Sequence, residues 1–511
     1  MTTTSQNAST TARPHLVWIM CDQLRWDALG FTGNSVVSTP NLDRLAEMGT
    51  VFEQAYVQSP VCVTSRACML TGRYLQNLNM ANGCPVLDPW EVTVPQILQE
   101  AGYATGLFGK LHLTPQQYTR DELGRDRPVT DAEPFMEAAG FRTPMPEAPE
   151  HRNYGFQQTV GFEDALWGEY LDWLDDQDTD LARDVRQWRQ EGEDTGVFER
   201  PEPEFPLGDV GTVNIPADLH PSSFIARHAV EFFHRHHSDQ PCFMHVSFVD
   251  PHHPWDPPAE IAAHYPPEEI PLPGRESCPL QWPPSLSERA SDSSGMSDEQ
   301  TRTVIAFYYA MIETIDRAVG QVVRAIEETG EVENTIFVFT ADHGELLGDY
   351  GLWRKGSYHF DCMIRMPCFL SAPGRLPGGR RVEGLIESVD IAPTLLSLVG
   401  LEPYAGMQGH DMAEALREGE AIGRDRIYCE MYTALWGPYV ACWTVRTETA
   451  KLNYYPQDEV GHLFDLEEDP EEIHDLWSSP EHRDLRDRMM ALLLRAQHEQ
   501  SDPLPRILSQ Y

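Results

Sequence analysis

Two short polar motifs each stand one residue beyond an apolar run that is typical of a buried strand. Asp22 and Gln23 follow HLVWIM, and Asp342 and His343 follow TIFVFT. Carboxylate, amide and imidazole groups suit a divalent cation, and ligands in open α/β sheets bind at the carboxyl ends of the strands. Each pair alone has a plainer explanation as turn or helix-capping residues. Taken together, the two pairs predict one metal site with four ligands.

A third motif, SPVCVTSRACMLTGRY, places a cysteine where we expect a helix to begin, near Val63. The dipole and the unpaired N–H groups at the start of a helix would stabilise the thiolate of Cys62. Arg66, about one turn later, would face the same way and could clamp a tetrahedral oxyanion. A packed, inert thiol is the simpler interpretation of Cys62 alone.

Further basic side chains stand in motifs that follow predicted strands. Lys110 and His112 are two residues apart in GLFGKLHL, and therefore on one face of an extended segment. His252 or His253 in VDPHHPWDPP could act as a general acid, and Lys355 in GLWRKGSYHFD follows the second metal motif. Exposed turn histidines and a surface lysine are the plain alternatives. The chain has no GxSxG, HExxH or GxGxxG motif.

The elements that must position these residues alternate between strand-like and helical patterns. In TPNLDRLAEMG, Thr39 is the expected N-cap, Pro40 the first helical residue and Gly49 the stop. TVPQILQEAGY repeats this pattern, and the strand-like ATGLFGK follows it. The longest predicted helix opens with a capping box of Ser297 and Gln300. This alternation predicts an α/β fold with a large, mostly parallel sheet.

Two changes in residue composition and pattern suggest how the chain is divided into domains. Residues 114–220 are rich in Pro, Asp and Glu, and we interpret them as a variable excursion on the substrate side. Near residue 420, YVACWTVRTETAKLNYYP and HLFDLEEDP indicate antiparallel hairpins, followed by a helix. We therefore predict a catalytic domain over 1–420 and a smaller C-terminal subdomain, with an antiparallel sheet and a helix, over 421–511.

Composition restricts the partners. The 80 acidic and 38 basic residues give a net charge of -42, which argues against nucleic acid and anionic membranes but admits a small anionic ester in a locally basic cleft. The start, MTTTSQNASTTARPH, lacks the apolar core of a secretory signal, no apolar run approaches ~20 residues, and the 10 cysteines form no framework. We expect a cytoplasmic homo-oligomer with reduced thiols. The tail DPLPRILSQY could dock on its own subunit or on a neighbour.

In chain order, these motifs resemble the sulfatase branch of the alkaline-phosphatase superfamily, which includes arylsulfatases and phosphonate monoester hydrolases. The most specific match is CVTSRACMLTGR, and HLFDLEEDPEEIHDLW resembles the C-terminal signature of the family. The resemblance therefore covers almost the whole chain. It implies an alkaline-phosphatase-like sheet sandwiched by helices.

The resemblance also implies a mechanism. A formylglycine-generating enzyme oxidises the cysteine of such proteins to an aldehyde, which hydrates to a geminal diol. One hydroxyl, activated by one divalent metal ion, attacks sulfur or phosphorus, and deprotonation of the other then expels sulfate. By position, the nucleophile is Cys62, facing the ion, and the metal ligands are Asp22, Gln23, Asp342 and His343. Arg66 orients the nucleophile, and His252 is the leaving-group acid. The residues that stabilise oxyanions or assist diol breakdown are Lys110, His112 and Lys355.

Two positions depart from the usual family pattern. Thr64 stands where the modifying enzyme usually meets proline, and Gln23 and His343 stand where many sulfatases carry Asp and Asn. The less anionic site favours Mn²⁺ or Zn²⁺ over Ca²⁺, and the same pairing resembles phosphonate monoester and phosphodiester hydrolases. We predict hydrolysis of sulfate monoesters. Two alternatives stay open: a phosphonate monoester or phosphodiester hydrolase, and a metal-binding pseudoenzyme with an unconverted cysteine.

Overall fold

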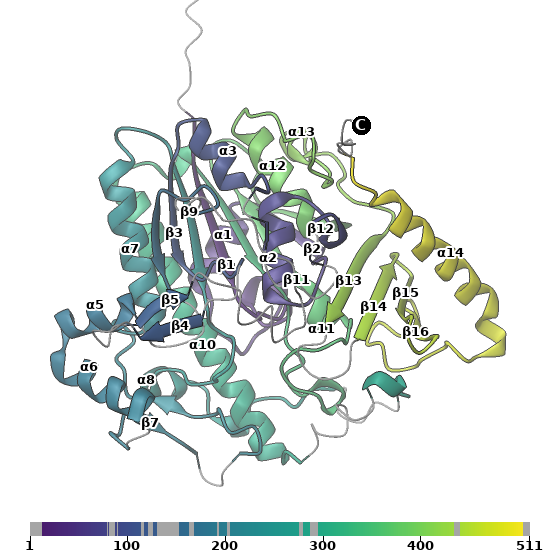
Figure 1. Ribbon diagram of the computed structural model, residues 1–511, viewed down its shortest axis with the longest axis horizontal. Helices are drawn as coiled ribbons and strands as arrows, with labels where there is room; N and C mark the ends of the chain where they lie inside the picture. The colour runs from purple at the N-terminus through teal and green to yellow at the C-terminus, as the bar shows by residue number, and fades with distance from the viewer. Residues whose placement is uncertain are drawn as a thin grey trace, which may run out of the picture.

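The centre of the molecule is an eight-stranded sheet (Figure 1). The computed structural model describes residues 13–78, 80, 87–88, 90–113, 117–120, 126–129, 153–162, 168–191, 194–201, 205–274, 280–286, 295–433 and 440–503. The strand order is β12-β2-β11-β10-β1-β9-β3-β6. The strands are β1 (His15–Cys21), β2 (Thr50–Tyr56), β3 (Ala104–Gly109), β6 (Gln158–Gly161), β9 (Cys242–Phe248), β10 (Thr335–Ala341), β11 (Arg365–Ser371) and β12 (Arg380–Glu387).

The sheet is mostly parallel. Strands β10, β1, β9, β3 and β6 are successive parallel neighbours, whereas β11 is antiparallel to both β10 and β2. Every residue of β1 and of β10 is buried. Such continuously buried strands are expected where helices cover both faces of a parallel sheet, and this is why HLVWIM and TIFVFT are apolar without alternation.

Two groups of helices pack around this sheet (Figure 1). One group comprises α1 (Pro40–Glu47), α7 (Pro221–His236) and α10 (Asp298–Glu328), and the other comprises α2 (Cys62–Thr71), α3 (Val94–Glu100) and α12 (Ile391–Leu398). The predicted capping box is present at the start of α10, where Ser297 Oγ accepts from Gln300 N at 3.2 Å and Gln300 Oε1 accepts from Ser297 N at 2.9 Å. The parallel α/β architecture is confirmed.

The start of α1 differs from the prediction in one respect. Thr39 occupies the N-cap position, but its side chain does not cap the helix. Its hydroxyl accepts instead from Gly30 N at 2.9 Å. The backbone amides of Asn41 and Leu42, in the first turn of the helix, donate to the Asp316 carboxylate of α10. A distant acid therefore satisfies the amides that a local cap would otherwise satisfy.

A separate four-stranded antiparallel sheet follows, in the order β13-β14-β15-β16. Its strands are β13 (Ile427–Thr433), β14 (Val440–Arg446), β15 (Ala450–Tyr455) and β16 (Val460–Asp465), and α14 (Arg483–Glu499) packs against it. The predicted C-terminal hairpins and helix are confirmed. The boundary at residue 420 stays a prediction, since Glu430 N of β13 donates to Gln58 O at 2.8 Å and so ties the two parts together.

The segment 114–220 is more than an excursion, because it contributes β6 to the edge of the main sheet. It also holds α5 (Glu169–Gln177), α6 (Thr179–Arg186), a π-helical turn (Gln187–Glu191) and the short strand pairs β4 (Gln117–Arg120) with β5 (Asp126–Val129) and β7 (Phe198–Glu199) with β8 (Thr212–Val213). The short helices α8 (Ala259–Ala262), α11 (Asp361–Ile364) and α13 (Ala413–Glu418) complete the described set.

Parts of three predictions fall outside the described residues: residues 1–12 of the N-terminal stretch, the tail DPLPRILSQY beyond its first two residues, and, within 114–220, residues 114–116, 121–125, 130–152, 163–167, 192–193 and 202–204. Within the described ranges, no helix has the length and apolarity needed to cross a bilayer.

Candidate active site

The two predicted ligand motifs meet at the carboxyl edge of the sheet. Strands β1 and β10 are parallel neighbours in register, so that Cys21 pairs with Ala341. The residues that follow, Asp22 and Asp342, therefore lie side by side, and Asp342 N donates to Cys21 O at 3.1 Å. Parallel pairing thus brings together two motifs that are far apart in the sequence.

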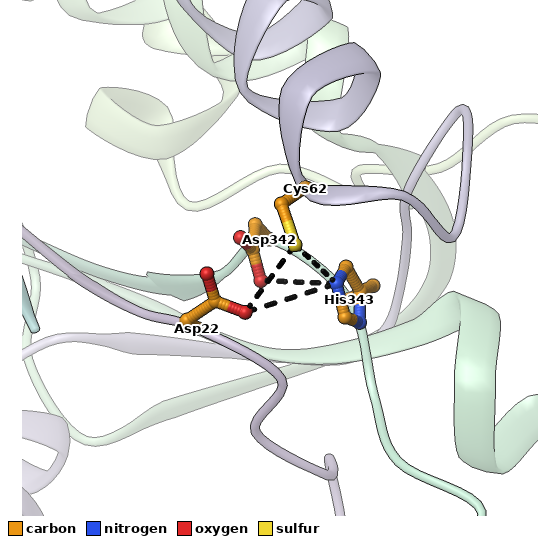
Figure 2. Close-up of side chains that lie close together, drawn as sticks. All are labelled: Asp22, Cys62, Asp342 and His343. Atoms are coloured by element: carbon orange, nitrogen blue, oxygen red, sulfur yellow. Dashed lines mark hydrogen bonds and ion pairs between the residues drawn. The ribbon is translucent and has the colours of Figure 1, made fainter. Parts of the chain in front are cut away.

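Four side chains converge at this edge (Figure 2). One ligand atom from each of Asp22, Cys62, Asp342 and His343 lies within 4.8 Å of the others, and all four residues are buried. Cys62 Sγ is 3.1 Å from His343 Nε2 and 3.5 Å from Asp22 Oδ1. His343 Nε2 is 3.8 Å from an oxygen of each aspartate. Two carboxylates, an imidazole and a sulfur at this spacing fit a single divalent cation.

The His343 ring is oriented for such a role. Its Nδ1 is 2.8 Å from the carbonyl oxygen of Gly344. Because a carbonyl oxygen can only accept a hydrogen bond, Nδ1 carries the proton. That tautomer leaves the lone pair of Nε2 facing the cluster. Burial lowers the pKa of His343 and outweighs the opposing charge of Asp342, so the ring is held in the neutral form that can bind a metal.

Gln23 adjoins the cluster through both its backbone and its amide. Its φ of 59° is unusual for a residue other than glycine, and its N–H donates to Asp342 Oδ1 at 2.9 Å. The side-chain Nε2 donates to the carboxylate of Glu345, and His253 Nδ1 is 3.5 Å away. Among the described residues, Gln23 Oε1 is buried without a hydrogen-bond partner. A buried carbonyl oxygen without a donor is the group that a cation would satisfy.

Buried cations surround the two carboxylates. Lys110 Nζ lies 2.7 Å from Asp22 Oδ2, and Arg66 Nε donates to Asp342 Oδ2 at 2.7 Å. Burial by itself would favour the protonated acid, but the charge of Lys110, followed by those of His252 and Lys355, holds the pKa of Asp22 well below its usual range. Asp22 is therefore ionised.

Arg66 is held by groups of the protein itself. Besides Asp342, its guanidinium donates to Asp22 at 3.3 Å and, through NH1, to Lys110 O and Ser247 Oγ, each at 2.8 Å. Four of its five N–H groups are thus used within the protein, and the side chain is buried. The donors that a bidentate oxyanion clamp would use are thus taken up by the carboxylates and strand ends, and the orienting role of Arg66 stays a prediction.

Cys62 is the first residue of α2, one residue before the predicted start. Lys355 Nζ donates to its sulfur at 2.7 Å. Burial, with the charge of Asp22, nevertheless raises the pKa of the Cys62 thiol to about 12, against the opposing effect of Lys355. The expectation of a stabilised thiolate is therefore wrong for the protein environment, since desolvation and a neighbouring carboxylate outweigh the helix start and the ammonium.

The two histidines of VDPHHPWDPP both reach the site. His252 Nε2 is 3.1 Å from Lys355 Nζ, and the two histidine rings stack with centroids 4.1 Å apart. His252 Nδ1 lies 2.5 Å from the carbonyl oxygen of His253, which fixes the orientation of the ring. His252 thus shares Lys355 with Cys62, and its role as the leaving-group acid stays a prediction.

His112 follows the same sheet edge but does not continue an extended segment. Strand β3 ends at Gly109, and His112 has a φ of 49° and is half-buried. The reasoning that placed His112 on the same face as Lys110 required extended backbone at both residues, and the backbone turns instead. The role of His112 stays a prediction.

Sequence reasoning missed two residues that support the cluster. Glu345 is buried, accepts from the Gln23 amide and accepts from Leu347 N at 3.0 Å. Ser247 lies near the end of β9 and accepts from Arg66. Glu345 lies two residues after His343, so its position beside a ligand pair was a usable signal, whereas nothing local marked Ser247.

Comparisons with known proteins agree with this geometry. The model of the sulfatase family matches residues 14–401, and a model described as N-sulphoglucosamine sulphohydrolase, C-terminal, matches residues 348–499. An arylsulfatase of Clostridium perfringens is 28% identical over 502 residues, which cover 94% of each chain. The multifunctional alkaline phosphatase superfamily protein PehA of Trinickia caryophylli is 27% identical and covers 92% of each.

Two solved structures share the fold over 96% of both chains. The phosphonate monoester hydrolase of Agrobacterium radiobacter has a TM-score of 0.76 at 23% identity, and that of Silicibacter pomeroyi has a TM-score of 0.77 at 24% identity. These structures support the alkaline-phosphatase-like architecture. Because the family model spans most of the chain and its motifs meet at one sheet edge, this chain belongs to the sulfatase family.

Proposed function

We propose that this chain is a metal-dependent hydrolase of sulfate monoesters that acts through a formylglycine derived from Cys62. The observation that carries the proposal is the position of Cys62. Its sulfur lies at the start of α2, in contact with Lys355 and within 3.5 Å of both Asp22 and His343. A nucleophile at this atom would face the metal ligands and a cation together.

The residues that would hold one divalent cation are Asp22, Gln23, Asp342 and His343. Their donor set of carboxylate, amide and imidazole groups admits Mn²⁺, Zn²⁺ or Ca²⁺. When bound, the ion supplies Lewis-acid polarisation of the ester and of the attacking hydroxyl. Gln23 Oε1 has no hydrogen-bond partner in the described part of the chain, and this supports its inclusion in the set.

The cations of the chain itself are suited to an anionic ester. Lys110, Arg66 and Lys355 bring three positive charges to the two carboxylates Asp22 and Asp342. In a buried site, such charges stabilise an anion far more strongly than they would in water. This local excess of positive charge would bind the ester despite the overall charge of -42.

His252 would serve the leaving group, and Lys355 would serve the nucleophile. His252 Nε2 would protonate the departing alcohol oxygen, while the carbonyl of His253 holds the other ring nitrogen. A hydrated formylglycine would supply one hydroxyl for attack. His112 would accept the proton of the second hydroxyl, so that the aldehyde C=O re-forms as the bond to sulfate breaks. Lys355, which lies against the sulfur of Cys62, would stabilise the oxygens formed there, with Lys110 and His112 assisting.

The ligand pairs Asp22-Gln23 and Asp342-His343 favour a second candidate, hydrolysis of phosphonate monoesters or phosphodiesters with the same residues. Side-by-side kinetics on an aryl sulfate and an aryl phenylphosphonate would separate the two. We expect the larger kcat/KM for the sulfate. A preference for the phosphonate by about 100-fold or more, equivalent to about 2.7 kcal/mol, would reverse the assignment.

Mass spectrometry of the tryptic peptide 45–66 tests the modification directly. We expect the aldehyde mass in protein that was co-expressed with a formylglycine-generating enzyme, and loss of all ester hydrolysis in Cys62→Ala. An intact thiol in an active enzyme would refute formylglycine. The pseudoenzyme would be supported if the thiol is intact, the protein hydrolyses no ester, and Cys62→Ala leaves metal binding unchanged. A cytoplasmic location and a homo-oligomer remain predictions.

A further inference from the structure

A pocket opens beside His252, on the side of the site formed by the 114–220 segment. The space between its lining atoms is about 440 Å³, much of which is open solvent at its mouth. His252 forms part of its wall, and Phe162, Val213 and Ile215 supply apolar surface. Because His252 is the proposed leaving-group acid, the alcohol part of a substrate would extend into this pocket.

Two charged side chains of the pocket face each other without a close ion pair. Arg189 NH2 is 3.5 Å from Asp256 Oδ2, which is at the limit of a hydrogen bond. Arg189 Nε is buried and has no hydrogen-bond partner among the described residues. The side chains of Arg189 and Asp256 are only 26% and 16% exposed, so water satisfies them poorly. Both therefore retain hydrogen-bonding capacity that a ligand could use.

Arg189 is held in place from behind. The Arg189 guanidinium stacks on Trp188, with its carbon 4.1 Å from the ring centroid. Trp188 in turn stacks on Phe198 of β7, with ring centroids 5.1 Å apart. The second acid of the pocket, Asp250, is already engaged, since it accepts from Ser222 Oγ at 2.5 Å. The recognition elements of the pocket are thus Arg189, Asp256 and the apolar wall.

We infer that this pocket selects esters whose alcohol part is uncharged and bears hydroxyl groups, with Arg189 and Asp256 as the residues that bind a hydroxyl. The inference rests on the proposed function and names its substrate class. A hydroxyl accepts from a guanidinium and donates to a carboxylate at once, so it bridges a pair held 3.5 Å apart. Arg189 would repel a cationic group, and Asp250 and the ionised form of Asp256 would repel an anionic group.

The protonation of Asp256 favours the same class. Burial raises the pKa of Asp256 to about 8, although Arg189 opposes the shift. The carboxyl group therefore exchanges its proton around neutral pH. A hydroxyl bonds well to both forms, as donor to the carboxylate and as acceptor from the acid. The walls Phe162, Val213 and Ile215 would cover the C–H surface of the same group.

The test compares esters that differ in the alcohol part. Glucose 6-sulfate carries hydroxyls, cyclohexylmethyl sulfate has a ring of equal size without them, and choline sulfate carries a cation. The measured quantity is the ratio of kcat/KM for glucose 6-sulfate to that for cyclohexylmethyl sulfate. We expect Arg189→Met and Asp256→Leu, which each remove the polar group, to lower this ratio about 10-fold, the effect of losing one good hydrogen bond to a charged group.

The control is Arg183→Met. Arg183 lies on α6, is mostly exposed and pairs with Asp180 and Asp184 outside the pocket. We expect the ratio to stay within about twofold in this variant. Equal losses on both esters in the Arg189 variant, an unchanged ratio, or a preference of the unsubstituted protein for choline sulfate would overturn the inference.

Failure of the proposed function would be visible separately. If the metal-replete protein hydrolyses none of the esters, calorimetric binding of glucose 6-sulfate and cyclohexylmethyl sulfate replaces the kinetics. Arg189→Met should then weaken binding of the first ester about 10-fold more than binding of the second. Equal affinities of the unsubstituted protein for both esters would overturn the inference in this form as well. Far-ultraviolet circular dichroism confirms that each variant is folded.

Discussion

The ammonium of Lys355 lies 2.7 Å from the sulfur of Cys62 and 3.1 Å from Nε2 of His252. One cation therefore touches both the proposed nucleophile position and the proposed leaving-group acid. A charge in this place can stabilise negative charge on the attacking side and keep the imidazole oriented on the other. Lys355 is thus the residue whose loss should separate chemistry from binding.

We predict that Lys355→Met lowers kcat for aryl sulfate hydrolysis by about 100- to 1000-fold, the usual effect of removing one preorganised charge from an oxyanion site. KM should change less than kcat, since Lys110 and Arg66 still provide positive charge. Steady-state kinetics on the metal-replete enzyme measure both quantities.

The neighbouring Arg354→Met is the control for this prediction, because Arg354 pairs with Asp209 away from Cys62. If kcat falls equally in both variants, disturbance of the loop that carries Arg354 and Lys355 explains the fall, and the loss of the Lys355 ammonium does not.

Glu345 should govern metal affinity through Gln23. Its carboxylate accepts from the Gln23 Nε2 group, and Oε1 of that amide has no hydrogen-bond partner within the ranges that the structure describes. We predict that Glu345→Leu weakens Mn²⁺ binding about 10- to 100-fold, as is usual for residues that orient a ligand. Glu345→Gln should retain more affinity, since its amide oxygen still accepts from Gln23.

Calorimetric titration of metal-free protein with Mn²⁺ gives these affinities without any turnover. Glu468→Gln, at an exposed position of the C-terminal part, serves as the control. If Glu345→Leu binds Mn²⁺ as tightly as the unsubstituted protein, Gln23 is either not a ligand or needs no support.

Removal of the metal should lower thermal stability as well as activity. Asp22, Asp342 and His343 are buried together, and a bound ion stabilises only the folded state, by about 2.7 kcal/mol when its concentration is 100 times Kd. We expect EDTA to abolish ester hydrolysis and to lower Tm by several degrees. Added Mn²⁺ or Zn²⁺ should restore both in the unsubstituted protein but not in Asp342→Asn. Full activity after exhaustive chelation would contradict the metal site.

Glu430 makes the stability of the fold depend on pH. It is buried on β13 and accepts from Gln76 N at 3.1 Å and from the hydroxyls of Tyr428 and Tyr432. Burial raises its pKa from 4.5 to about 7, although these donors oppose the shift. The folded state thus holds the proton more tightly than the unfolded chain. This stabilisation is fully present below pH 4.5 and is lost as the pH rises to about 7.

Glu430→Gln removes the ionisation but keeps an acceptor for the tyrosines. Relative to the unsubstituted protein, its free energy of unfolding should therefore rise by about 3 kcal/mol between pH 4.5 and pH 8. Urea unfolding at several pH values measures this difference, with the exposed Glu468→Gln as a pH-independent reference. A constant difference across this range would show that Glu430 titrates normally.

Local patterns in the sequence determined the fold class and the candidate residues. Continuous apolar runs at 15–20 and 335–340 predict buried parallel strands because such strands are covered on both faces. The capping box of Ser297 and Gln300 predicts the start of α10 because both of its hydrogen bonds lie within one turn. Polar residues directly beyond the strands mark the ligand motifs for the same local reason.

Only the tertiary structure decided how these residues act on one another. The Asp22 and Asp342 motifs meet because β1 and β10 pair in register, and no local signal specifies which strands become neighbours. Arg66 bonds to carboxylates, and the Cys62 thiol keeps its proton, because desolvation and charge depend on every group packed around them. Sequence periodicity reports local geometry and burial pattern; the contacts that set charge, pKa and pocket shape are long-range, so they exist only in the folded chain.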